Sequence, residues 1–112
     1  MQTGNIYSRI PDQLQGEFFD TLVQNQTLRL ERIISTGQAT PEGEWYDQAW
    51  DEWVVLLTGS ATLRFESEEP LFEMTPGNYV FIPARCRHRV EQTDTKEKTV
   101  WLALHIQPEI KG

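Results

Sequence analysis

Residues 52–59 read Glu-Trp-Val-Val-Leu-Leu-Thr-Gly: a carboxylate, five consecutive apolar residues and a turn signal. Alternate side chains of a strand share a face, which places Glu52, Val54 and Leu56 together. The other face is apolar as well, and a run that is apolar on both faces is typical of a buried strand. Burial of an unpaired carboxylate is costly, so we expect Glu52 to meet a cation, hydrogen-bond donors or water.

The residues after this run predict how the chain continues. Residues 61–66 alternate apolar and polar side chains, and Thr58-Gly59-Ser60 separates them from the first run, which predicts a β-hairpin. Similar short runs, divided by Pro, Gly and Asn, follow and predict an all-β sandwich or barrel. From residue 45 onward the expected strands are 45–49, 52–58, 61–66, 71–74, 79–82, 87–93 and 99–106.

The N-terminal part gives weaker signals. Residues 27–34 read as a further strand, and residues 35–44 contain the Gly and Pro of a loop. The apolar residues within 16–23 predict one or two helical turns. We therefore expect a short, partly helical N-terminal segment before the all-β region.

Length and composition limit the function. A chain of 112 residues suits a single domain, 1–112, with one hydrophobic core. The net charge of −7 argues against nucleic acid and anionic membranes as partners. The apolar runs are too short to span a bilayer, and the first residues lack the features of a signal peptide. The single cysteine, Cys86, allows no internal disulfide, and we expect a cytoplasmic protein.

Two spacings point to a family. Gly59 follows Glu52 by seven positions, and Pro83 and His88 follow Gly77 by six and eleven. These spacings resemble the two motifs of the cupin family, and the resemblance covers residues 43–106. It implies a cupin-type double-stranded β-barrel of the jelly-roll class.

The resemblance also implies a metal site, which is incomplete here. Cupins with the full motifs hold a divalent metal ion with three histidines and one glutamate. Matched residue by residue, Glu52 and His88 are ligands, while Gln48 and Tyr46 stand where the first motif has its two histidines. An amide and a phenol are weaker ligands than imidazole for iron, manganese, zinc or nickel. We expect Gln48 as a ligand and Tyr46 as a ligand or proton donor, the alternative being that no metal binds.

The second histidine, His105, lies in the strand expected at 99–106. If this strand forms a hairpin with 87–93 that turns about Lys96 and Glu97, His105 and His88 lie opposite one another. With Glu52 they would make a set of two imidazoles and one carboxylate, as in non-haem iron sites. The alternative is that both histidines are hydrogen-bonded structural residues.

Two more residues are candidates for substrate binding. Arg85, Arg87 and Arg89 alternate along one strand, which predicts a solvated basic face. Alternatively, Arg85 bends to the mouth of the barrel and receives an anionic substrate, and Trp50 lines the entrance. Cys86 is expected to be a small core residue.

These observations leave two functions open. The first is a metal-dependent cupin that acts on a small organic molecule as a dioxygenase or isomerase. The second is a metal-free cupin that binds or senses a small molecule such as a sugar or an anion. In either case we expect a homodimer, because many small cupins pair through sheets or N-terminal strands. Its contacts are expected at Ile6, Tyr7, Leu28 and Leu30.

Overall fold

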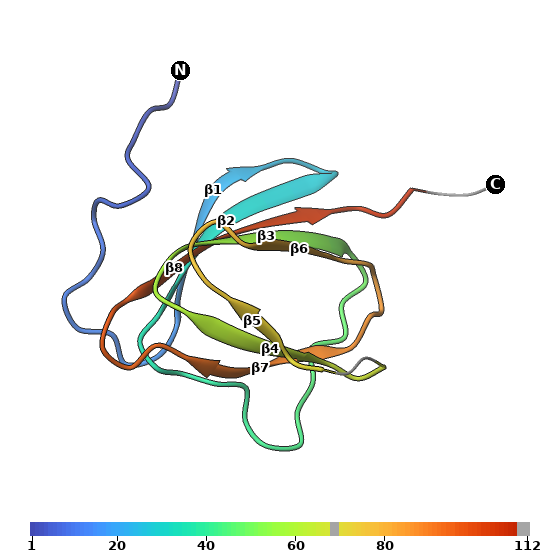
Figure 1. Cartoon of the computed structure of the whole chain (residues 1–112). Helices are drawn as coiled ribbons and strands as arrows, with labels where there is room; N and C mark the ends of the chain where they lie inside the picture. Colours follow the sequence, from blue (N-terminus) through green and yellow to red (C-terminus); the bar gives the residue numbers. More distant parts are fainter. Residues whose placement is uncertain (68–69, 110–112) are drawn as a thin grey trace.

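A computed structural model describes residues 1–67 and 70–109, which contain eight β-strands in two antiparallel sheets and no helix (Figure 1). One sheet has the strand order β1-β2-β8-β3-β6 and the other β5-β4-β7, which confirms the all-β prediction. Within these residues no helix is long and apolar enough to cross a membrane. The strands are β1 (Phe18–Gln24), β2 (Leu28–Ser35), β3 (Asp51–Thr58), β4 (Ala61–Phe65), β5 (Phe72–Met74), β6 (Tyr79–Ile82), β7 (His88–Thr93) and β8 (Thr99–Ile106).

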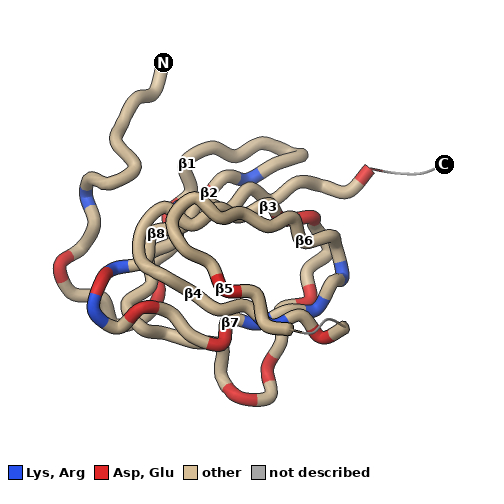
Figure 2. Tube along the Cα trace, viewed as in Figure 1, with Lys and Arg blue, Asp and Glu red and all other residues tan. Residues whose placement is uncertain are grey.

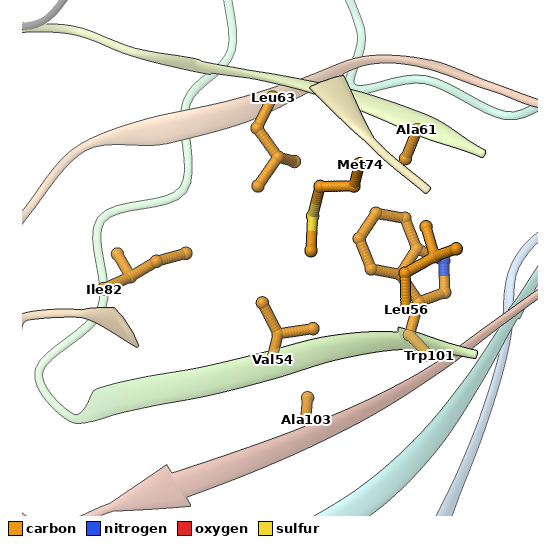
Figure 3. Packing of buried hydrophobic residues seen from close by; sticks show 8 residues of the cluster. All are labelled: Val54, Leu56, Ala61, Leu63, Met74, Ile82, Trp101 and Ala103. Atoms are coloured by element: carbon orange, nitrogen blue, oxygen red, sulfur yellow. The ribbon is translucent and has the colours of Figure 1, made fainter. Parts of the chain in front are cut away.

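The core lies between the two sheets, where their apolar faces meet (Figure 3). The alternation predicted for β3 is confirmed, because Glu52, Val54 and Leu56 are all buried on its inner face. Removing a large aliphatic side chain from water stabilises the fold by about 1.5–3 kcal/mol. The core cluster consists of Val54, Leu56, Ala61, Leu63, Met74, Ile82, Trp101 and Ala103.

The hairpin predicted between β3 and β4 is wrong. Both edges of β3 are occupied, by β6 and β8, and β4 pairs with β5 and β7 in the other sheet. The chain therefore crosses between the sheets at Gly59, whose φ is +80°. A side chain at this position would also collide with Thr99, whose Cα lies 2.7 Å from where a Cβ would stand. Glycine thus allows the crossing in two ways.

The hairpin predicted between β7 and β8 is wrong as well. β7 pairs with β4, whereas β8 lies in the other sheet between β2 and β3. The connection crosses the molecule through a turn in which Asp94 Oδ1 accepts hydrogen bonds from the backbone N–H groups of Lys96 (2.7 Å) and Glu97 (3.0 Å). His88 and His105 therefore come from opposite sheets.

The N-terminal prediction of helical turns is also wrong, because most of 16–23 belongs to β1. The strand pairs with β2, and Phe18 and Phe19 lie opposite Ile34 and Ile33. Pairing with the free edge of β2 outweighs a weak local pattern. The strand predicted at 45–49 is reduced to one isolated bridge, from Tyr46 to His88.

A buried arginine fixes the segment before β1. Arg32 is 4% exposed, and its Nη1 donates hydrogen bonds to the carbonyl oxygens of Ile6 (2.8 Å) and Ser8 (2.6 Å). Its Nη2 lies 3.0 Å from the carboxylate of Asp20 on β1. These bonds hold the N-terminal segment against the outer face of β1 and β2.

Candidate functional site

A cavity of about 90 Å³ opens between the two sheets, next to the core. Its wall is mostly apolar, from side chains that include Ile33, Val54 and Trp101. Five residues predicted from the sequence line it together. They are Tyr46, Gln48, Glu52, His88 and His105.

Backbone pairing brings these five side chains to one place. Glu52 on β3 lies directly opposite His105 on β8. Tyr46 and His88 exchange two backbone hydrogen bonds of 2.7 and 3.1 Å, and their rings stack with centroids 5.5 Å apart. The carbonyl of Gln48 accepts a hydrogen bond of 2.7 Å from the backbone N–H of Arg85. The loop before β3 is thereby tied to the loop before β7.

The imidazole of His88 is oriented toward Glu52. Its Nδ1 lies 2.9 Å from the carbonyl oxygen of Cys86, which can only accept, so Nδ1 carries the proton. Its Nε2 then faces the carboxylate of Glu52 at 3.6 Å, with both side chains buried. Burial lowers the pKa of His88, but Glu52 and the Cys86 carbonyl stabilise the imidazolium more, so the pKa lies above 6.5.

His105 has a different partner. Its Nε2 donates a hydrogen bond of 2.9 Å to Glu31 Oε1, and the other carboxylate oxygen of Glu31 lies 3.7 Å from Arg29 Nε. The hydrogen bond from His105 lowers the pKa of Glu31, burial opposes this, and the charges of His105 and Arg29 lower it further. The pKa of Glu31 is therefore below its ordinary value of 4.5.

Sequence reasoning missed two carboxylates of the cavity, Glu17 and Glu31. Glu31 had a signal, since the alternation of 27–34 puts this carboxylate on one face with Ile33. Glu17 had none, because the apolar pattern of 16–23 predicted helical turns, which do not direct this side chain to the cavity. It is held by Ser35, whose Oγ donates a hydrogen bond of 2.6 Å to Glu17 Oε2 and accepts one of 3.1 Å from Trp101 Nε1.

Tyr46 lines the cavity with a phenol whose pKa is raised. Burial raises the pKa of its phenol above 10.0, and the negative charges of Glu17 and Glu52 raise it further. At neutral pH the phenol therefore keeps its proton. The neutral phenol is a poor metal ligand but a good hydrogen-bond donor to a molecule in the cavity.

The two residues predicted to bind substrate do not line this cavity. Arg85 is exposed and pairs with Asp47 at 3.3 Å, and Trp50 lines a neighbouring hollow that shares Gln48 and His105 with the cavity. Their roles stay predictions. The backbone of Arg85 has a φ of +66°, so the position where the cupin motif has glycine does adopt a left-handed conformation. Cys86 is partly buried against the core, as expected.

The cavity offers two side chains of types that bind metal ions strongly, a carboxylate and an imidazole. Glu52 and His88 Nε2 face each other, and Gln48 adds an amide oxygen on the same cavity. His105 Nε2 is engaged by Glu31. Within the residues that the structure describes, no three His, Cys, Asp or Glu side chains form a group that could hold a metal ion. Any ion here would need weaker donors or water to complete its coordination.

Comparison with solved structures identifies the family. No family model and no curated protein matches the sequence. The chain is 44% identical to a putative mannose-6-phosphate isomerase from Ralstonia eutropha JMP134, covering 96% of this chain and all of that one, with a TM-score of 0.93.

Two more distant structures share the fold. A cupin superfamily protein from Desulfitobacterium hafniense has 14% identity and a TM-score of 0.72, over 88% of this chain and 84% of its own. A conserved Streptococcus pyogenes protein of unknown function has 20% identity and a TM-score of 0.73, over 97% and 90%. Together with the inward Glu52 and His88, these comparisons show that the chain belongs to the cupin superfamily.

Proposed function

We propose that this cupin binds a divalent transition metal ion through Glu52 and His88 and acts on a small organic molecule in the same cavity. The observation that carries the proposal is the separation of 3.6 Å between His88 Nε2 and Glu52 Oε1. This is too long for a good hydrogen bond. Two donor atoms bound at about 2.1 Å to one ion lie roughly 3.0–3.6 Å apart.

The surroundings of His88 support the same proposal. A histidine that binds a metal usually donates its other ring N–H to a carbonyl or carboxylate. His88 does this with the Cys86 carbonyl, which directs the lone pair of Nε2 into the cavity. Gln48 is the proposed third ligand, and His105, which the sequence suggested as a ligand, is proposed to join only if it leaves Glu31.

The chemistry follows from the side chains around this pair. A bound metal ion would polarise a carbonyl or hydroxyl oxygen of the ligand. The Tyr46 phenol can donate a proton, and the hydrogen-bonded pair of His105 and Glu31 can hold one at the opposite wall. Most of the wall between them is apolar. Proton transfer between two carbons, as in an isomerase, suits this arrangement better than a dioxygenase reaction.

A metal-free binding module is the second candidate. It is supported by the small number of strong metal-ligand side chains. Only two of them, Glu52 and His88, face each other, and no third such side chain among the described residues completes a group with them. In that case the two residues form a buried ion pair, with the raised pKa of His88 as its consequence. The cavity would then bind a small molecule without transforming it.

We also propose that the strands close into the cupin barrel and that the chain forms a homodimer. The outer face of the five-stranded sheet supports the dimer, because Phe81, Trp53, Leu104 and Leu30 lie side by side across β6, β3, β8 and β2. Phe81 is 50% exposed and Tyr79, on the same face, is 63% exposed. Adjacent exposed aromatic residues are typical of protein contacts.

Metal titration tests the proposed function. Calorimetry with Mn²⁺ or Ni²⁺ on protein purified without chelator should give one site per chain. His88→Ala and Glu52→Gln should each weaken this site by at least about tenfold. Glu73→Gln, an exposed carboxylate on β5, is the matched control and should bind as wild type does. No uptake by wild-type protein at saturating metal would leave the binding module as the function.

A further inference from the structure

The charged groups that line the cavity are of one sign. Three carboxylates line it, Glu17, Glu31 and Glu52, and none of the described lining residues is a lysine or an arginine. The whole chain is acidic too, with 17 acidic and 10 basic residues. Figure 2 shows that the charged residues of its described part are distributed along the chain. The two histidines are the only side chains of the described lining that can become positive.

One nearby arginine, Arg29, is close to a cavity carboxylate, and the others form ion pairs elsewhere. Arg29 touches Glu31 at 3.7 Å with a side chain that is 42% exposed, so its charge is shared with solvent. The three arginines around β7 form ion pairs away from the cavity. These pairs are Arg85 with Asp47, Arg87 with Glu66, and Arg89 with Glu91.

The carboxylates are also held in place. Glu17 accepts a hydrogen bond from the fully buried Ser35, and Glu31 accepts one from His105. Fixed carboxylates offer a ligand hydrogen-bond acceptors, and a further negative charge in this partly enclosed space would be repelled. The aromatic rings of Phe19, Tyr46 and Trp101, which also line the cavity, can attract a cation.

We propose that the metal-free cavity takes a small uncharged or cationic molecule that donates hydrogen bonds, and rejects phosphorylated and other anionic ligands. The inference rests on the proposed function in one respect, namely that this cavity is where the ligand binds. The proposed ligand differs from the one in the name of the 44% identical structure, because mannose 6-phosphate carries a phosphate group. The ligand's polar atoms would be hydroxyl or ammonium groups.

Reaction of a cysteine at the cavity mouth measures this selectivity without knowledge of the ligand. Cys86→Ala removes the native thiol, and Phe19→Cys places a new one on the cavity wall, where Phe19 is 52% exposed. The thiol is modified by a cationic (trimethylammonioethyl) or an anionic (sulfonatoethyl) methanethiosulfonate. The ratio of the two rates reports the local potential, since any shift in thiol reactivity affects both reagents alike.

Val23→Cys is the matched control thiol. Val23 lies on the same strand and is 51% exposed, but it does not line the cavity. The ratio of cationic to anionic rates at position 19 should exceed that at position 23 by at least about tenfold. Glu17→Gln should reduce the excess, and Glu73→Gln should not. Ile33→Cys, also on the wall, is the second variant should position 19 disturb folding.

Two results would overturn the inference: equal ratios at the two positions, or protection of the thiol by mannose 6-phosphate at a concentration where mannose gives none. Metal titration of the same proteins separates the two proposals. Metal uptake without charge selectivity removes only this inference, and charge selectivity without metal uptake removes only the metal site.

Discussion

His88 on the three-stranded sheet faces Glu52 on the five-stranded sheet, and Nε2 and Oε1 lie 3.6 Å apart across the interior. Their strands do not pair with one another, so the contact exists only because the two sheets are packed face to face. Both side chains are buried, so the charge of Glu52 acts directly on the imidazole of His88. The relationship can be tested before any ligand is known.

Glu52→Gln should lower the pKa of His88 in the metal-free protein. Burial disfavours the imidazolium, and the negative charge of Glu52 is one of the groups that outweigh burial in wild type. Without that charge, the balance moves toward the neutral ring. An NMR titration of the imidazole signals measures the change. An unaltered His88 titration would show that the two side chains do not interact in solution, and Glu73→Gln serves as the control.

The strands themselves could be predicted from the sequence. The alternation in residues 52–66 located β3 and β4, and Val54, Leu56 and Leu63 are inward as it indicates. Such local patterns survive because one face of each strand is buried. In a fold of two sheets, strands that are consecutive in the sequence need not pair. Both predicted hairpins are wrong for this reason.

The candidate site was predictable where a motif or a strand parity fixed a side chain. Glu52 and His88 have motif spacings, and His105 has the inward parity of β8. Its partner, however, depends on the pairing of β2 with β8, which the local pattern does not contain. Glu17 is on the cavity wall only because β1 pairs with β2, in place of the predicted helical turns.

Glu31 should make the stability of the protein sensitive to acid. Its pKa is lowered in the folded state by the hydrogen bond from His105, so its contribution is fully present above the unfolded-state value of 4.5 and is lost as the pH falls through the folded-state value. The difference in denaturation midpoint between wild type and Glu31→Gln should therefore shrink from pH 7 toward pH 3. A difference that stays constant over this range would contradict the role of the charge.

Leu56→Ala should destabilise the protein by about 2–5 kcal/mol, because Leu56 is fully buried and its removal leaves a cavity. Guanidinium-induced unfolding followed by tryptophan fluorescence measures the loss. Leu71→Ala is the matched control, since Leu71 is 42% exposed and its truncation should cost less than about 0.5 kcal/mol. Equal losses in the two variants would mean that the assignment of the inner face of β3 is incorrect.

Phe81→Lys should convert the proposed homodimer to a monomer. Phe81 is 50% exposed on the outer face, beside Trp53 on β3, and a charge there could not be desolvated in a contact between sheets. Light scattering at micromolar concentration gives the mass directly. Leu71→Lys, an exposed apolar position outside this sheet, should leave the mass unchanged. A monomer mass for wild-type protein would reject the dimer itself.

Arg85→Gly should keep the free energy of unfolding within about 1.5 kcal/mol of the wild-type value. Arg85 has a φ of +66°, and a residue with a side chain pays roughly 1–2 kcal/mol for that conformation, whereas glycine adopts it freely. Glycine lowers the free energy of unfolding by about 0.5–1 kcal/mol, because it makes the unfolded chain more flexible. The ion pair with Asp47 is exposed and adds at most about 1 kcal/mol.

Comparison with Arg85→Ala isolates the backbone effect, because both variants lose the ion pair and only alanine keeps a Cβ. The glycine variant should be more stable than the alanine variant by up to about 1.5 kcal/mol in urea-induced unfolding, which is the upper limit of the difference between the two backbone costs. If the alanine variant were the more stable one, the left-handed conformation at Arg85 would not carry strain. Replacement of the motif glycine by arginine would then cost no stability in the loop before β7, whose Arg85 N–H binds the Gln48 carbonyl.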